Sequence, residues 1–150
     1  MVGPSYDLEF YEDENGDMPV LRWIREELTP QKRRALGTAM NEILQHLGPN
    51  IVAGNFGDTL GGGLFEFRLD QDVHQILARV GKKAKTKDTR GGKILSRVFC
   101  HAHGNKIILL LGAYDKGKSL SASRQQSEIA RARKRLDNWN ERRKRERNQP

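Results

Sequence analysis

The segment that most constrains the fold is residues 107–111, where five consecutive side chains are apolar. A strand that is apolar on both faces must be covered on both sides, so it belongs in the middle of a sheet. Another strand is predicted over residues 94–103, and Gly104 and Asn105 then suit a tight two-residue turn. We therefore predict a hairpin formed by residues 94–103 and 106–114.

Further strands are indicated by the spacing of apolar residues. Residues 6–11 alternate apolar and acidic side chains, as a half-buried strand does. Residues 64–69 form a second strand-like run that follows three glycines. Residues 73–80 alternate in the same way and predict another strand. Residues 50–63 are rich in glycine and asparagine, which predicts a loop.

Three helices are predicted. A long helix begins at Thr29 and Pro30, a capping hydroxyl followed by a proline, and ends at Gly48. The last helix begins with capping-box spacing at residues 123–126, and its apolar pattern stops after Trp139. A short first helix carries apolar residues at helical spacing: Val20, Leu21, Ile24 and Leu28.

Together these elements predict an α+β fold, in which two N-terminal helices and one C-terminal helix pack on a twisted, mainly antiparallel sheet. A chain of 150 residues suits one domain, which we place at residues 1–140. Residues 81–92 predict a basic surface loop within it. Residues 141–150 lack an apolar pattern and are predicted to form a basic, flexible tail.

The formal net charge of +8 is unevenly distributed, because residues 1–30 are acidic and two later regions are basic. A basic face favours nucleic acid, an acidic membrane surface or an acidic partner protein. For a terminal run of charges, a merely solubilising tail is the alternative interpretation. The candidate RNA-binding residues are Lys82, Lys83, Lys85, Lys87, Arg90, Lys118, Arg133 and Lys134.

Cations at the ends of neighbouring strands predict an anion site. Arg68 and Arg97 each lie on a strand, and Lys116 follows the next strand along the chain. Because guanidinium groups match phosphate oxygens with two parallel hydrogen bonds, a phosphate backbone is the natural ligand on a basic protein. The alternative for each arginine alone is a salt bridge, for instance from Arg68 to Glu66 or Asp70.

Candidates for proton transfer lie on the same two strands. Strand alternation places His101 and His103 on the face of Arg97, and Cys100 on the opposite, core-facing side. Tyr114 ends the following strand. The two histidines also have the spacing of metal ligands, but a zinc site needs at least a third ligand, so we predict no metal. A histidine beside arginines suits general acid–base chemistry better.

The location of the protein is predicted from what the chain lacks. Residues 1–7 contain neither the basic nor the hydrophobic region of a secretory signal. The longest apolar run, residues 107–111, is far too short to cross a bilayer. Cys100 is the only cysteine, which is typical of a reducing compartment. We therefore expect a cytoplasmic protein that does not bind a membrane.

Read in order, these segments resemble a known family. Residues 63–68 read Gly-Leu-Phe-Glu-Phe-Arg, residues 97–99 read Arg-Val-Phe, and the apolar strand leads into Lys116 and Lys118. The final helix contains Glu-Ile-Ala-Arg-Ala at residues 128–132. Over residues 18–138 this pattern is similar to the phage-derived branch of the RelE/HigB-type toxins.

The resemblance implies a compact RelE-like fold and a type II toxin–antitoxin system. Such a toxin is an mRNA-cleaving endoribonuclease that acts on translating ribosomes, needs no metal or other cofactor, and is neutralised by a cognate antitoxin protein. On this interpretation the 2′-hydroxyl of RNA is the nucleophile, and the protein orients the phosphate and moves protons. The candidate catalytic residues are Arg68, Arg97, His101, His103, Tyr114 and Lys116.

Two other functions remain open at this point. One is a ParE-like toxin, which has the same fold but inhibits gyrase by binding and performs no RNA chemistry. The other is a non-catalytic RNA-binding module, in which the sheet arginines hold phosphate and no product forms. Fold-level analogy does not separate these functions, because one fold can carry several activities.

Overall fold

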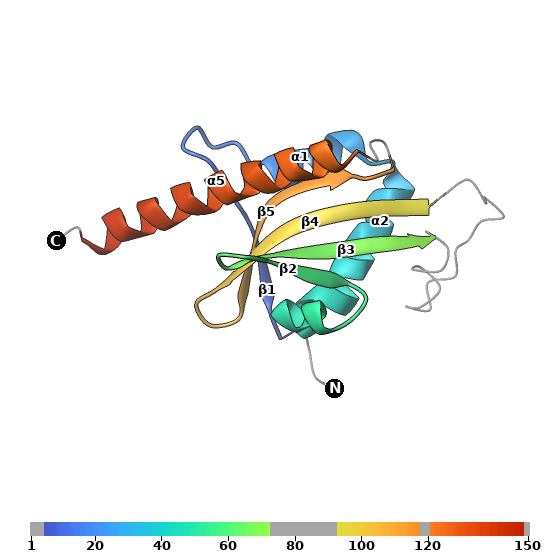
Figure 1. The fold of residues 1–150 in the computed structure, drawn as a ribbon, viewed down its shortest axis with the longest axis horizontal. Helices are drawn as coiled ribbons and strands as arrows, with labels where there is room; N and C mark the ends of the chain where they lie inside the picture. Colours follow the sequence, from blue (N-terminus) through green and yellow to red (C-terminus); the bar gives the residue numbers. More distant parts are fainter. Residues whose placement is uncertain (1–4, 73–92, 118–120, 149–150) are drawn as a thin grey trace.

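A five-stranded mixed sheet runs through the computed structural model, which describes residues 5–72, 93–117 and 121–148 (Figure 1). The strand order is β1-β5-β4-β3-β2. β1 runs parallel to β5, and every other neighbouring pair is antiparallel. The strands are β1 (Asp7–Phe10), β2 (Gly57–Gly61), β3 (Leu64–Asp72), β4 (Lys93–His103) and β5 (Ile107–Asp115).

The predicted hairpin of β4 and β5 lies in the interior of the sheet. β5 lies between β1 and β4, and its residues 108–111 are all buried, as an apolar run on both faces requires. β4 rather than β5 is the central strand. The connection is a three-residue loop and not the predicted two-residue turn, because His103 pairs with Ile107 and Lys106 adopts a left-handed conformation with φ 68°.

The edge strand β2 was not predicted. Its sequence, Gly-Asp-Thr-Leu-Gly, has almost none of the β-branched and aromatic residues that favour strands, so residues 50–63 resembled a loop throughout. Pairing with β3 makes this segment a strand, which ends at Gly61 and is followed by a turn at Gly62 and Gly63. All three glycines have positive φ, between 63° and 82°, which explains their clustering here. Residues 48–53 before the strand form a 3₁₀ helix, η2 (Gly48–Ala53).

One face of the sheet is covered by the N-terminal helices. α1 (Pro19–Glu27) and α2 (Pro30–Ala39) confirm two predicted helices, and Thr29 caps α2 by accepting the Lys32 N–H. α2 continues through a π-helical turn, η1 (Met40–Leu44), into α3 (Gln45–Leu47). These helices bury the larger apolar core, which includes Leu36, Leu44, Phe65, Phe67, Val98 and Leu110.

The opposite face is covered by α5 (Ala122–Arg147), which lies across the strands in Figure 1. A second apolar core fills the space beneath it: Leu64, Phe99, Leu109, Leu111, Ala132 and Leu136. The α+β class is therefore confirmed, with helices on both faces of the sheet.

Both ends of α5 differ from the prediction. The capping residue is Ser121 and not Ser123, because the Ser121 hydroxyl accepts the Arg124 N–H at 3.1 Å. The helix also continues to Arg147, well beyond Trp139. Contacts to the N-terminal segment accompany this extension, since Arg142 donates to the Glu12 carbonyl and its guanidinium lies over the Tyr11 ring. None of the described helices is both long enough and apolar enough to span a membrane.

Replacing Ser121 with alanine is expected to lower the free energy of unfolding by about 1 kcal/mol, because the first turn of α5 loses its capping acceptor. Urea denaturation of the purified protein measures this. Ser123→Ala is the matched control, since the Ser123 hydroxyl lies 3.5 Å from that of Ser121 but, within the described residues, caps no backbone N–H. Equal effects of the two substitutions would contradict the assignment of Ser121 as the cap.

Candidate active site

The residues best suited to bind an anion and to transfer protons form a row across three neighbouring strands. Arg68 of β3 lies opposite Arg97 of β4, and Arg97 lies opposite Tyr114 of β5. Directly opposed residues point to the same face of a sheet, about 4.8 Å apart along each step. This face is the one that α5 covers, because Tyr114 belongs to the same apolar core as Ala132 and Leu136. The predicted convergence of both arginines and Tyr114 is therefore present in the structure.

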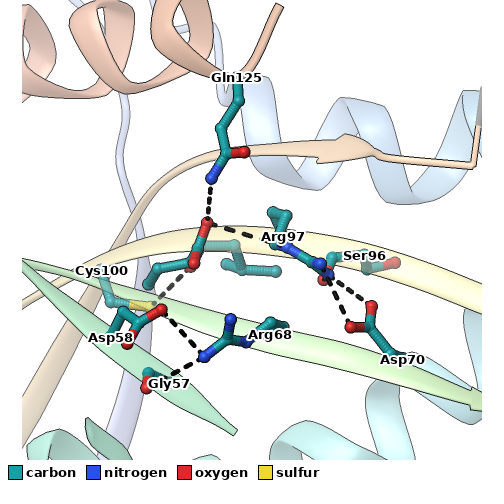
Figure 2. A network of polar contacts seen from close by, with 10 residues as sticks. Gly57, Asp58, Arg68, Asp70, Ser96, Arg97, Cys100 and Gln125 are labelled. Carbon is teal, nitrogen blue, oxygen red and sulfur yellow. Dashed lines mark hydrogen bonds and ion pairs between the residues drawn. The ribbon is translucent and has the colours of Figure 1, made fainter. Parts of the chain in front are cut away.

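Arg97 is the buried centre of this row. Its residue is only 3 % exposed, and its guanidinium forms two parallel hydrogen bonds with the carboxylate of Asp70, at 2.6 and 3.2 Å. The Arg97 Nε also lies 3.9 Å from Glu66 Oε1. Figure 2 shows the Arg97 side chain extended along the sheet toward Asp70. Glu66 and Asp70, which were predicted as salt-bridge partners of Arg68, are thus ion-pair partners of Arg97.

Arg68 lies nearer to solvent and has a different partner. Its guanidinium is 2.9 Å from the carboxylate of Asp58, on the unpredicted strand β2 (Figure 2). The side chain of Arg68 is 31 % exposed and that of Asp58 is 57 % exposed. Among the described residues, the buried Nε of Arg68 has no hydrogen-bond partner. Within the described part of the chain, Arg68 therefore retains one donor that is not paired.

Glu66 is a functional candidate that the sequence interpretation treated only as a salt-bridge partner. It is 2 % exposed, and its Oε1 accepts a hydrogen bond of 3.3 Å from the Gln125 side chain of α5. Burial raises the pKa of Glu66 above its ordinary value, and the positive charge of Arg97 opposes that shift. The only sequence signal was its place on the Arg68 face of β3, because the covering helix could not be located from sequence.

Tyr114 is buried in the same row, at 1 % exposure. Its ring stacks on Phe99 at a centroid distance of 6.1 Å, and the Arg124 guanidinium lies 5.6 Å from the ring centroid. Burial raises the pKa of the Tyr114 hydroxyl, and Arg97 opposes the shift. That hydroxyl is buried without a hydrogen-bond partner among the described residues. A buried hydroxyl left unpaired is costly, so this position needs an explanation.

Lys116 directly follows β5, two positions after Tyr114, and its positive charge opposes the rise in the pKa of Glu66. It is partly buried, and its backbone N–H donates to the Leu95 carbonyl at 2.7 Å. The predicted addition of a lysine to the two arginines is thus compatible with its position. Cys100 faces the other core, is 0 % exposed and confirms its predicted role as a core residue.

The two histidines are not brought to the arginine row. His101 lies four positions after Arg97 along β4, a distance of about 13 Å. His101 Nδ1 lies 2.8 Å from the Gly63 carbonyl, and His103 Nε2 lies 2.9 Å from the Glu9 carboxylate. Both rings contact Trp139, with centroids 5.7 and 4.5 Å away. In the described part of the chain, no group of three or more His, Cys, Asp or Glu side chains could hold a metal ion.

The candidate RNA-binding residues are only partly within the described chain. Arg133 of α5 donates to the carbonyls of Leu60 and Gly61, at 3.0 and 3.2 Å, and so holds the β2–β3 turn. Lys134 is exposed on the same helix. The predicted strand at residues 73–80 and the loop at residues 81–92 lie outside the described residues. The same is true of Lys82, Lys83, Lys85, Lys87, Arg90 and Lys118.

No protein-family model matches this chain, and no curated protein matches it at a significant level. The function is therefore inferred from the residues of the site and from their arrangement.

Proposed function

We propose that this chain is a toxin-type endoribonuclease that cleaves mRNA on translating ribosomes and binds the scissile phosphate at the Arg68–Arg97–Tyr114 row. The observation that carries the proposal is the register of the sheet, which places two guanidinium groups and a phenol side by side on three strands. Lys116 lies two positions beyond Tyr114, directly after the end of β5. A site of this composition suits an anion on which charge builds up during a reaction.

The chemistry needs little more than this row. The 2′-hydroxyl of RNA supplies the nucleophile, so the protein has to orient the phosphodiester and stabilise the additional negative charge. Arginine suits both tasks, because its planar donors match phosphate oxygens in pairs. The side chain of Arg68 is 31 % exposed, whereas that of Arg97 is 4 % exposed, so Arg68 is the arginine of the row that solvent reaches.

RNA must compete with carboxylates already present at the site. Asp70 occupies the guanidinium of Arg97, and Asp58 occupies that of Arg68. Both carboxylates are partly exposed, at 41 % and 57 %. A phosphodiester would exchange with these exposed groups, so its affinity should fall steeply as salt concentration rises. Cations of α5 outside the row would add affinity without sequence preference.

The proposed partners follow from this charge distribution. mRNA on the ribosome is the proposed substrate, and a cognate antitoxin with an acidic segment is the proposed inhibitor. An acidic protein segment would compete with RNA for the same cations, as Asp58 and Asp70 do within the chain. The proposed location is the cytoplasm, where translating ribosomes are found.

Arg68→Ala is expected to reduce the rate of mRNA cleavage by about 10²-fold, because the transition state loses a charged donor. Primer extension on mRNA after a short induced pulse in cells maps and quantifies the cuts. Arg22→Ala is the matched control, because Arg22 is an exposed arginine of α1 that pairs with Asp17 outside the row. Cleavage should be unchanged in this control.

The outcomes separate the proposed function from its competitors. Codon-phased cuts that Arg68→Ala reduces and Arg22→Ala preserves support the nuclease. Growth arrest with intact mRNA would overturn it in favour of a gyrase-binding toxin. RNA binding without arrest and without cuts would instead identify a non-catalytic RNA-binding module.

A further inference from the structure

Two titratable side chains remain buried in the row without an assigned task. Glu66 and Tyr114 are 2 % and 1 % exposed, and both adjoin Arg97. Burial of an ionisable carboxyl group is costly unless it is paired, and burial of an unpartnered hydroxyl is costly as well. Apolar side chains of similar size would fill the same space without this desolvation cost.

We propose that Glu66 is the general base and Tyr114 the general acid of the reaction, with Arg97 binding the phosphate between them. This assignment rests on the proposed ribonuclease function and deepens it. It replaces His101 and His103 as the proton-transfer groups, because these residues lie about 13 and about 20 Å from Arg97 along β4.

The geometry around Arg97 supports this pair. Glu66 Oε1 lies 3.9 Å from the Arg97 Nε on one side, and Tyr114 is its direct neighbour on β5. Phe99 stacks on the Tyr114 ring and restricts its orientation. The Tyr114 hydroxyl is buried and has no partner among the described residues, so its proton is not committed to another group there. Glu66 and Tyr114 therefore flank Arg97 on its two neighbouring strands.

The protons balance in this scheme. The Glu66 carboxylate takes the proton of the 2′-hydroxyl, and the 2′-oxygen forms a bond to phosphorus. The bond from phosphorus to the 5′-oxygen breaks, and that oxygen takes the Tyr114 proton. The products are a 2′,3′-cyclic phosphate and a 5′-hydroxyl. Exchange with water then removes the proton from Glu66 and returns one to Tyr114, so no metal, oxidant or other co-reactant enters the step.

The first turn of α5 covers this pair. Gln125 donates to Glu66, and the Arg124 guanidinium lies over the Tyr114 ring, where Glu128 holds it by an ion pair of 3.1 Å. Figure 2 shows Gln125 descending from α5 onto the sheet. RNA can reach the two groups only when these contacts open. The start of α5 is therefore part of the site.

The charges facing each group set the sign of the pH dependence. Burial raises the pKa of Glu66, Asp58 adds to the shift, and Arg97, Arg68 and Lys116 oppose it. The base form of Glu66 is needed, so the cleavage rate should rise as pH passes that raised pKa. For Tyr114, burial raises the pKa, to which Glu66 and Glu128 add, while Arg97 and Arg124 oppose it. The acid form of Tyr114 is thus retained throughout the neutral range.

Single-turnover cleavage of mRNA on purified ribosomes, measured across pH, tests the assignment. Glu66→Gln should reduce the maximal rate by about 10²–10³-fold and remove the rise of the rate with pH, and Glu66→Asp should restore part of both. Tyr114→Phe should cost about 10²-fold. Binding of RNA with a 2′-deoxy scissile nucleotide should change less than about twofold in these variants, because Arg68 and Arg97 are intact.

Glu42→Gln and Tyr6→Phe are matched controls that lie outside the row, and both should cleave at the wild-type rate. Circular dichroism and thermal unfolding establish that each variant is folded. If the wild type cleaves and Glu66→Gln and Tyr114→Phe keep its rate and pH profile, the proton-transfer assignment is overturned while the nuclease stands. If the folded wild type cuts no RNA, the proposed function fails and the assignment fails with it.

Discussion

Arg97→Met is expected to lower the free energy of unfolding by about 3–5 kcal/mol at neutral pH, because it leaves a buried carboxylate without its counter-ion. Glu66 is 2 % exposed, and Arg97 is its ion-pair partner among the described residues, with 3.9 Å between Nε and Oε1. Asp70 also loses its partner but reaches water, since its side chain is 41 % exposed. The loss should therefore arise mainly at Glu66, and urea denaturation measures it.

The same variant should show a defined dependence on pH. Arg97 lowers the pKa of Glu66, so its removal moves that already raised pKa further upward. A carboxyl group with a raised pKa in the folded state is favourable below its unfolded pKa, and this contribution is lost as pH rises through the folded value. The difference in melting temperature between wild type and Arg97→Met should therefore be largest at alkaline pH. It should narrow as pH falls and Glu66 becomes protonated.

A double-mutant cycle isolates this effect. Adding Glu66→Gln to Arg97→Met removes the stranded charge, so the double variant should be more stable than Arg97→Met alone by at least about 1 kcal/mol. Arg68→Met is the matched control, because Arg68 is 31 % exposed and its partner Asp58 is mostly in water. That control should cost less than about 1 kcal/mol. If the effects of Arg97→Met and Glu66→Gln on the free energy of unfolding were additive, Arg97→Met would not leave the Glu66 carboxylate without a counter-ion.

The faces of the inner strands could be predicted from sequence because alternation is a local property. Arg97 and Phe99 on one face of β4, and Val98 and Cys100 on the other, followed directly from the period of two. The structure confirms this division, since Phe99 belongs to the core under α5, whereas Val98 and Cys100 belong to the core under the N-terminal helices. The start of α2 at Thr29 could be predicted for the same reason, because the cap is formed within one turn.

The partners of these faces could not be predicted, because they depend on contacts between distant segments. Asp58 reaches Arg68 only because β2 pairs with β3, and the sequence of β2 carries little strand preference. Gln125 reaches Glu66 across 59 positions of the chain. Burial of the row follows from where α5 packs, and amphipathic spacing does not specify which face of a sheet a helix covers. The sequence thus indicated the cations of the site, but it did not indicate which carboxylate pairs with each cation or that α5 covers them.

Phe67→Ala is expected to be the most destabilising single change in the larger core, at about 3–5 kcal/mol. Phe67 is 0 % exposed and lies opposite Val98 on β4 and Gly57 on β2. Gly57 leaves room for Ile51, since a Cβ there would come within 2.8 Å of the Ile51 side chain. The neighbours of Phe67 are held by two strands and a 3₁₀ helix, so they cannot collapse into the space that its ring leaves.

Leu47→Ala is the matched control, because it also removes an apolar side chain but from a site that is 46 % exposed. It should cost less than about 1 kcal/mol, since little apolar surface leaves water there on folding. Thermal and urea denaturation of both variants test the contrast. A small effect of Phe67→Ala would mean that α1 and α2 can close onto the sheet without it. In that case Phe67 would not be needed to hold the sheet that carries the buried Arg97–Glu66 pair on its other face.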